Sequence, residues 1–262
     1  RIALGGMGEV WRAAHTEIGH KVAVKTIRSE RATSAILRAR FEGEARAASR
    51  LRSPYVAQIF DYGVGIDGSP FLVMELLEGV SLHASVKATG AMPLSLVAAV
   101  VSQVARALGE AHTHGLVHRD VKPDNVFLED LGDDALAGAP FRAKLIDFGI
   151  ARLVEQRGRR ITGEGSFIGT PGYSSPEQFL GEEVGPASDL WSLGAVTYFA
   201  ATGIAPLVAT DQASFAARTL DEPFPVPSRV RPELPPAFDA WLARACALRP
   251  ADRFANAAEM GK

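Results

Sequence analysis

Two short polar motifs constrain this chain more than any other feature. Residues 118–125 read HRDVKPDN, and DFG follows at residues 147–149, where Asp147 lies 22 positions beyond Asn125. Phosphoryl transfer from a nucleotide requires a bound cation, an acceptor for the hydroxyl proton and positive charge near the phosphates. Asp120 can accept the proton, Lys122 can offset the charge, and Asn125 and Asp147 carry the oxygen ligands that Mg²⁺ prefers. The two motifs together predict a phosphotransfer site, whereas DFG alone would mean little.

The amino-acid composition limits the class of protein to which this chain can belong. The chain has 262 residues, 47% of them hydrophobic, with 28 Lys and Arg against 30 Asp and Glu and a single cysteine, Cys246. These values exclude a mainly disordered chain and a disulfide framework. The absence of a basic surplus argues against a nucleic-acid partner. One cysteine is compatible with a reducing compartment, and we expect a cytoplasmic location.

One stretch is long and uncharged enough to suggest a membrane span. Residues 190–208 contain no charged side chain, but Gly194, Gly203 and Pro206 interrupt them. A buried core helix followed by a turn is the favoured interpretation. We therefore expect no membrane contact by this segment.

The order of strand-like and helical patterns predicts an α+β chain with two lobes. Residues 22–27 and 71–74 have strand composition, and residues 30–51 between them have helical composition with one apolar face. Helices are predicted at 94–112, 180–202 and 237–248. The prediction is a small N-terminal lobe of residues 1–77 and a larger, mainly helical lobe of residues 78–262.

Two further patterns each allow two interpretations. Residues 221–236 hold six prolines, which suit a polyproline ligand or, as we favour, a rigid connector between helices. His112, His114 and His118 have a spacing that could suggest zinc. We reject that interpretation because no cysteine or further ligand set lies nearby.

The motifs of residues 118–125 and 147–149, joined by GTPGY at 169–173 and SPE at 175–177, resemble those of protein kinase catalytic domains. Within that family the chain is similar, from end to end, to the bacterial serine/threonine kinases of eukaryotic (Hanks) type. Lys122 and the GTPGY segment are typical of serine/threonine kinases and not of tyrosine kinases. The resemblance implies a bilobal kinase fold, ATP with Mg²⁺ or Mn²⁺, and protein substrates.

The resemblance also implies a nucleotide site in the N-terminal lobe. Residues 5–10 are similar to the glycine-rich loop that covers the phosphates, although Ala3 stands where the pattern has an earlier glycine, a departure that bears on ATP affinity. No helix pattern follows these glycines, which excludes a Rossmann site, and no Gly-Lys-Ser or Gly-Lys-Thr occurs. The implied nucleotide-binding residues are Ile2, Leu4, Gly5, Gly6, Met7, Gly8, Val10, Ala23, Lys25, Met74, Glu75, Leu77 and Phe127. Ile2, Val10, Ala23 and Phe127 would sandwich adenine, Met74 would be the gatekeeper, and Glu75 and Leu77 would offer backbone groups.

Lys25 matches the kinase lysine that contacts the α- and β-phosphates. The resemblance implies that it forms an ion pair with Glu44, and Glu42 is a competitor with a less suitable spacing. Asp120 would be the catalytic base, assisted by Lys122, while Asn125 and Asp147 would bind the metal.

Regulation and architecture are implied by the same resemblance. Residues 147–177 match an activation loop, in which phosphate on Thr162 or, second, Ser166 would pair with Arg119. Asp189 matches a buried helix aspartate that holds the backbone of the catalytic loop. Glu177 and Arg253 match a structural ion pair.

The predicted function is ATP-dependent phosphorylation of Ser or Thr hydroxyls on proteins, in bacterial signalling and under control of activation-loop phosphorylation. The alternative is a pseudokinase that binds nucleotide as a scaffold. A small-molecule phosphotransferase is a third option, but it should lack residues 169–177. We expect the chain to be part of a longer, membrane-anchored or soluble protein, and the resemblance is compatible with a dimer that autophosphorylates in trans.

Overall fold

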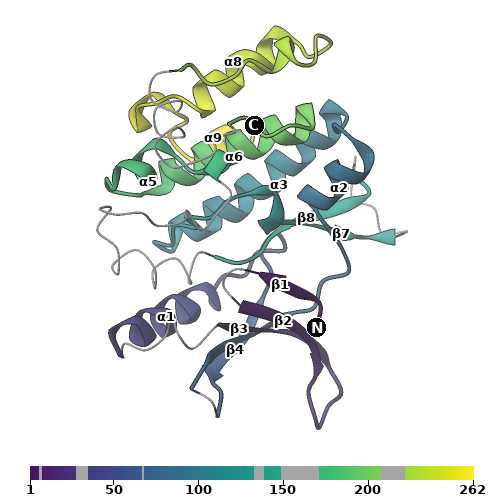
Figure 1. Cartoon of the computed structure of the whole chain (residues 1–262), viewed down its shortest axis with the longest axis vertical. Helices are drawn as coiled ribbons and strands as arrows, with labels where there is room; N and C mark the ends of the chain where they lie inside the picture. Colours follow the sequence, from purple (N-terminus) through teal and green to yellow (C-terminus); the bar gives the residue numbers. More distant parts are fainter. Residues whose placement is uncertain (6–7, 28–34, 67, 133–138, 149–170, 208–221) are drawn as a thin grey trace.

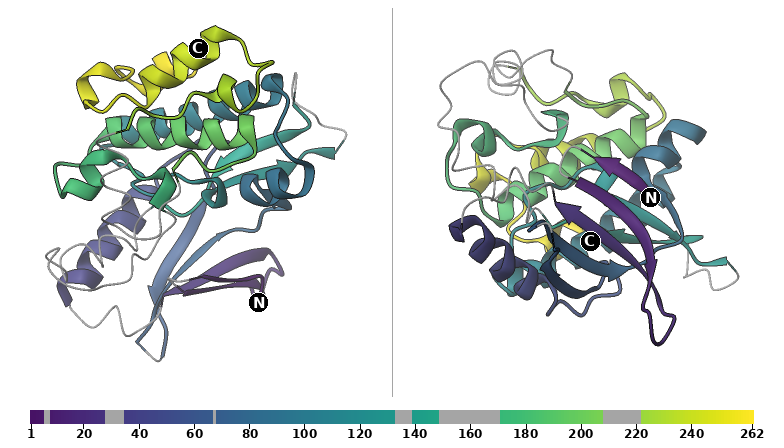
Figure 2. Two further views of the ribbon diagram at one scale, coloured as in Figure 1. Left: turned by 45° about the horizontal axis from the view of Figure 1, so that its top comes forward. Right: turned by 60° about the horizontal axis from the view of Figure 1, so that its bottom comes forward.

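The chain folds into two lobes stacked along its long axis (Figure 1). The computed structural model describes residues 1–5, 8–27, 35–66, 68–132, 139–148, 171–207 and 222–262. The N-terminal lobe is a sheet with one long helix beside it, and the C-terminal lobe is mainly helical (Figures 1 and 2). The predicted α+β fold of two lobes is confirmed.

The N-terminal lobe is a five-stranded antiparallel sheet in the order β1-β2-β3-β5-β4. Its elements are β1 Ala3–Gly5, β2 Gly8–Ala14, β3 Lys21–Ile27, α1 Ala35–Ala48, β4 Ile59–Val64 and β5 Pro70–Glu75. The β-branched run of β3 occupies the centre, where β2 and β5 satisfy both of its edges. This central position places Lys25 opposite Val10 on one side and Leu72 on the other.

The C-terminal lobe combines a three-stranded sheet with stacked helices (Figure 2). The strands are β6 Gly79–Ser81, β7 Val126–Asp130 and β8 Phe141–Leu145, and the helices are α2 Leu82–Thr89, α3 Leu94–Thr113, α5 Pro176–Leu180, α6 Pro186–Thr202, α8 Pro236–Ala245 and α9 Ala257–Met260. The predicted lobe boundary after Leu77 falls in the connector between β5 and β6.

Helices α3 and α6 form the centre of this lobe. α3 is long and apolar enough to cross a membrane by length and composition, and it buries one face, which includes Val97, Val104 and Leu108, in the core. α6 is buried on all sides from Ser188 to Ala201. The uncharged stretch that follows Leu190 is therefore a core helix, as predicted.

The prediction of a single helix over residues 180–202 was wrong at its start. Leu180 ends the short helix α5, and Gly181 follows in a left-handed conformation with φ of 68°. A side chain would be strained there, so glycine is suited to ending the helix. α6 begins only at Pro186, which occupies the first turn, where its missing N–H is tolerated.

The proline-rich segment is a packed connector in the part that the structure describes, residues 222–236. Pro227 and Leu234 are buried, and the ring of Phe224 meets Trp191 of α6 edge-on at 5.6 Å between centroids. Pro223, Pro232, Pro235 and Pro236 are exposed. The contacts of Phe224, Pro227 and Leu234 with the helical lobe nevertheless support the interpretation as a rigid connector.

Candidate active site

The catalytic-loop carboxylate, Asp120, lies buried between two nitrogen donors. The Nζ atom of Lys122 is 2.9 Å from its Oδ2 atom, and Nδ2 of Asn125 donates to the same oxygen at 3.1 Å. Nδ2 of Asn125 also donates to the backbone carbonyl of Asp120 at 2.8 Å. Residues 123–125 form a short 3-10 turn, which brings Asn125 back onto Asp120. One oxygen of Asp120 is thus oriented by local chain geometry.

Asn125 and Asp147 offer oxygen ligands that fit Mg²⁺ or Mn²⁺. Because the amide nitrogen of Asn125 donates to Asp120, its Oδ1 atom is the side-chain atom suited to a cation. The backbone N–H of Ile146 donates to the carbonyl of Asn125 at 3.0 Å, which brings the residue before Asp147 beside Asn125. No group of three or more His, Cys, Asp or Glu suited to a metal occurs within the described ranges. One carboxylate with few further protein ligands is the usual Mg²⁺ arrangement where phosphates complete the shell.

Asp147 is paired with Lys25, whose Nζ atom lies 2.8 Å from Oδ1. Burial by itself would raise the pKa of Asp147, but the ammonium of Lys25, with smaller help from His118 and Lys122, holds this pKa below its usual value. Asp147 also has a φ of 58°, which is uncommon outside glycine. The carboxylate is therefore kept ionised in a strained backbone position, a combination typical of functional residues.

His118 links the catalytic loop to the segment of Asp147. Its Nδ1 atom accepts from the backbone N–H of Asp120 at 3.3 Å, so its Nε2 atom carries the proton and donates to the carbonyl of Ile146 at 3.1 Å. Its ring lies 4.7 Å from that of Phe148. Burial lowers the pKa of His118 and favours the neutral imidazole. These contacts give His118 a structural role that needs no zinc.

Asp189 of α6 holds the backbone of the catalytic loop. Its two carboxylate oxygens accept from the backbone N–H groups of His118 and Arg119, each at 2.8 Å, and Oδ2 also lies 2.8 Å from Nε2 of His112. Arg119 has a φ of 65°, and strain of this kind persists only when surrounding contacts hold it. The buried carboxylate of Asp189 supplies such contacts.

Sequence reasoning missed Gln178, which holds the other side of Arg119. Its amide nitrogen donates to the carbonyl of Arg119 at 2.8 Å, and its amide oxygen accepts from the backbone N–H of Ser175 at 2.9 Å. A Ser followed three residues later by Gln is the signature of a helix N-terminus, and it could have drawn attention to this residue.

The predicted ion pair between Lys25 and Glu44 is wrong for this structure. Lys25 instead pairs with Asp147. Glu44 lies on α1, and its Oε1 atom is 3.3 Å from Nη1 of Arg119. Within the described part of the chain, no ion pair joins Lys25 to Glu44. Arg119 offers Glu44 a competing cation, and Asp147 offers Lys25 a competing carboxylate, so both charges are paired without their expected partner.

The predicted nucleotide positions lie on the N-terminal sheet, on the connector that follows β5 and, for Phe127, on β7. Gly5 and Gly8 face each other at the ends of β1 and β2, and Gly6 and Met7 lie outside the described residues. Ala23 is buried and is the cross-strand partner of Met74.

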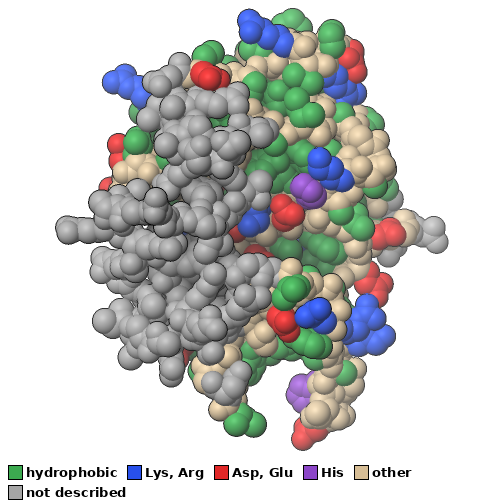
Figure 3. Space-filling model, in the orientation of Figure 1, with side chains coloured by type: hydrophobic (Ala, Val, Ile, Leu, Met, Phe, Trp, Pro, Cys, Tyr) green, Lys and Arg blue, Asp and Glu red, His purple; other side chains and the backbone are tan. Residues whose placement is uncertain are grey.

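Ile2 and Leu4 are 52% and 57% exposed. Val10 follows on β2 and Phe127 on β7, and Glu75 and Leu77 stand at the start of the connector. Hydrophobic side chains, with acidic and basic ones beside them, are visible in a recess at mid-height of the molecule (Figure 3). The roles of these residues toward ATP stay predictions.

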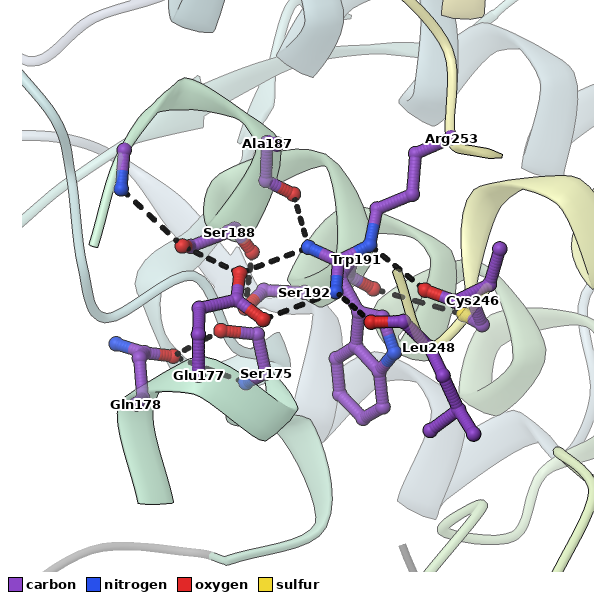
Figure 4. Close-up of polar contacts among 12 residues, drawn as sticks. Ser175, Glu177, Gln178, Ala187, Ser188, Trp191, Ser192, Cys246, Leu248 and Arg253 are labelled. Atoms are coloured by element: carbon purple, nitrogen blue, oxygen red, sulfur yellow. Dashed lines mark hydrogen bonds and ion pairs between the residues drawn. The ribbon is translucent and has the colours of Figure 1, made fainter. Parts of the chain in front are cut away.

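Glu177 and Arg253 form a closed, buried ion pair (Figure 4). Nη1 and Nη2 of Arg253 contact the two carboxylate oxygens of Glu177 at 2.8 and 2.9 Å, and the hydroxyl of Ser188 donates to Glu177 at 2.6 Å. Burial alone would raise the pKa of Glu177, but these hydrogen bonds lower it to about 2. The pair fastens α5 to α6 and to the chain that follows α8.

Thr162 and Ser166, the predicted phosphorylation sites, lie outside the described residues, so the structure offers no test of them.

The fold and this arrangement of Asp120, Asn125 and Asp147 define a protein kinase catalytic domain, and comparison with known proteins agrees. The family model described as the protein kinase domain matches residues 1–260, so the chain belongs to that family. Members of the family use ATP, normally with a divalent metal ion.

Curated relatives are serine/threonine-protein kinases. The chain is 39% identical over 256 residues to PknH of Mycobacterium bovis, covering 98% of this chain and 41% of PknH. It is 40% identical over 262 residues to PknL of Mycobacterium tuberculosis, covering all of this chain and 62% of PknL. The chain thus spans less than two thirds of the length of these relatives. They place it among the bacterial serine/threonine kinases of Hanks type, as predicted.

Solved structures agree on the fold. The kinase domain of Mycobacterium tuberculosis PknI superposes with a TM-score of 0.76 at 28% identity, covering 99% of this chain and 90% of that one. Rad53 residues 1–466 superpose with a TM-score of 0.80 at 23% identity, over 99% of this chain and 62% of that one, which supports the fold alone.

Proposed function

We propose that this chain transfers the γ-phosphoryl group of ATP to Ser and Thr hydroxyls of proteins, in bacterial signalling. The observation that carries the proposal is the position of Asp120, whose carboxylate is oriented by Lys122 at 2.9 Å and Asn125 at 3.1 Å. His118 links this loop to the segment of Asp147. General acid–base catalysis requires such a positioned acceptor.

Each residue of the site has a defined role in this proposal. Asp120 accepts the proton of the substrate hydroxyl, and Lys122 stabilises the negative charge of the transferring group. Asn125 and Asp147 hold Mg²⁺ or Mn²⁺, which neutralises charge on the phosphates when bound. Lys25, already beside Asp147, holds the α- and β-phosphates.

The test is Asp120→Asn, assayed with radiolabelled ATP and a general protein substrate. We expect phosphate transfer to fall by about a hundredfold or more, since the proton acceptor is lost, while ATP binding is retained. Asp124→Asn is the matched control, because Asp124 is exposed in the same loop. Wild-type protein that binds ATP without transferring phosphate would instead identify a pseudokinase.

We also propose that activation-loop phosphorylation acts through Arg119. In this structure Arg119 is engaged by Glu44. A phosphate on Thr162 or Ser166 carries more negative charge than a carboxylate and would compete for the guanidinium. Glu44 would then be released toward Lys25, which is the arrangement that kinases need for turnover.

Mass spectrometry of the active protein tests this regulation. Phosphate should be found on Thr162 or Ser166, and Thr162→Ala combined with Ser166→Ala should lower the activity. Full activity in protein that is unmodified at both positions would contradict the proposal.

We place the domain in the cytoplasm, where ATP is available, as the catalytic part of a longer protein. Mixing active protein with the Asp120→Asn variant tests phosphorylation in trans. Label on the inactive variant would support a dimer that autophosphorylates, and its absence would count against one.

A further inference from the structure

A buried lysine outside the kinase motifs joins the two lobes at the connector. Lys144 of β8 is 4% exposed, and its Nζ atom lies 2.6 Å from Oε1 of Glu75 and 3.4 Å from Oε1 of Glu129 on β7. Glu75 ends β5 and begins the connector. A buried ammonium is retained only where charged partners offset its desolvation, so this position is closely constrained.

Glu75 is held from both lobes. Its backbone N–H donates to the carbonyl of Gln58 at 2.9 Å, and its Oε2 atom accepts from the backbone N–H of Gln58 at 3.3 Å. Its other carboxylate oxygen reaches across to Lys144. The side chain of Glu75 therefore bridges the segment before β4 in the N-terminal lobe and β8 in the C-terminal lobe.

Lys144 also stands beside the predicted floor of the adenine site. Phe127 of β7 is its direct cross-strand partner. Directly paired residues in an antiparallel sheet point to the same face, with Cβ atoms about 5 Å apart. The aliphatic stem of Lys144 thus adjoins Phe127 while its ammonium holds Glu75.

The connector is fastened to the same sheet further along. The backbone N–H of Asp130 donates to the carbonyl of Glu78 at 3.0 Å, and Gly79 pairs with Glu129. Gly79 has a φ of 142°, and a Cβ atom there would lie only 2.1 Å from the carbonyl oxygen of Leu128. The end of the connector is therefore fixed by backbone contacts, and its start by Glu75 and Lys144.

We propose that Lys144 is a positioning residue for the purine base of the nucleotide, acting through Glu75 on the connector and through Phe127 on the floor. This inference rests on the proposed ATP site. It concerns the base and not the phosphates, since no phosphate-site residue is among the contacts described for Lys144.

Adenosine separates this role from a phosphate contact. Titrations of adenosine and ATP are compared in wild-type protein and in Lys144→Met, with Lys87→Met of the exposed α2 position as matched control. We expect Lys144→Met to weaken both ligands by the same factor, roughly five- to tenfold, with kcat changed less than KM for ATP. Unchanged adenosine affinity, or loss of ATP affinity alone, would overturn the proposal.

Glu75→Gln and Glu129→Gln provide a second test should Lys144→Met fail to fold. Glu75→Gln should weaken adenosine binding severalfold, whereas Glu129→Gln, which removes a charge from the same lysine but leaves the contact of Lys144 with Glu75 in place, should change it less than twofold. Equal effects of the two variants would refute the role of the connector. Wild-type protein that binds neither ligand would reject the ATP site itself, and this inference with it.

Discussion

Two sets of ion pairs in this molecule differ in how completely they are enclosed. Arg253 makes five hydrogen bonds, two to Glu177 and one each to the carbonyls of Ala187, Ala247 and Leu248, and its side chain is 0% exposed. Lys25 lies 2.8 Å from Asp147 and Arg119 lies 3.3 Å from Glu44, and the side chains of these two pairs are 12–27% exposed.

This difference indicates which ion pairs stabilise the fold and which can change partners. A guanidinium has five N–H donors, and all five of Arg253 are used, so no other partner can replace Glu177 without breaking several bonds. The two pairs of the active site can change partners at small cost, since water and a nucleotide offer them alternatives. A catalytic cycle requires ion pairs in the active site that can change partners, while the ion pair that holds the helices together stays fixed.

The largest effect that would test this comparison is the loss of Arg253. Arg253→Met should lower the free energy of unfolding by about 3–5 kcal/mol, because it leaves the carboxylate of Glu177 buried and unpaired. Urea unfolding followed by circular dichroism measures it. The double variant Glu177→Met with Arg253→Met should recover part of the loss, and a single variant as stable as wild type would contradict the comparison.

The pH dependence of stability sharpens the same point. The pKa of Glu177 is about 2 in the folded protein and 4.5 in the absence of its partners. Because the folded value is lowered, the stabilisation by Glu177, on the order of 3 kcal/mol, is complete above about pH 5 and disappears as the pH falls toward 2. The difference in unfolding free energy between wild type and Glu177→Gln should shrink over this range. A difference that stays constant with pH would exclude Glu177 as its source.

The exchangeable pairs should behave in the opposite way. Glu44→Gln should change stability by less than about 1 kcal/mol, as expected for a partly exposed pair. Its activity should fall by roughly tenfold or more, because Lys25 loses the carboxylate that would hold it over the phosphates. Thermal unfolding and a kinase assay on the same preparation measure both. Unaltered activity would mean that Glu44 stays with Arg119 during turnover.

The smallest effect concerns the helix that follows Arg253. Oδ1 of Asn256 accepts from the backbone N–H of Glu259 at 2.9 Å and caps α9. Asn256→Ala should cost about 1 kcal/mol of stability and leave kinase activity unchanged. A loss of activity would show that the region around Arg253 affects catalysis, which would contradict the distinction between structural and exchangeable ion pairs.

Much of the fold and the site could be predicted from local patterns. Asp120, Lys122 and Asn125 lie within six residues, so a short turn is enough to bring them together. The strand around Lys25 followed from its β-branched composition, and the apolar face of α3 followed from side-chain periodicity. The boundary near Leu180 had signals in the sequence, because Gly181 and Gly185 interrupt the apolar pattern and Pro186 favours a helix start, and the prediction of one continuous helix overlooked them.

The sequence could not predict which of several residues of like charge, far apart in the chain, would form each ion pair. Glu44 could pair with Lys25 or with Arg119, and both are basic residues at suitable places in the sequence. Lys144 carries no signal in the local sequence, because nothing near it in the chain shows that Glu75 is its partner.

The amino-acid sequence by itself determined the chemistry of this protein: which residues can accept a proton, hold a cation and neutralise phosphate, and that they belong to a kinase domain. Only the tertiary structure decided which charges are partners. Pairing depends on distances between segments that are tens of residues apart and on burial, which sets the strength of each interaction, and neither quantity is written in local sequence.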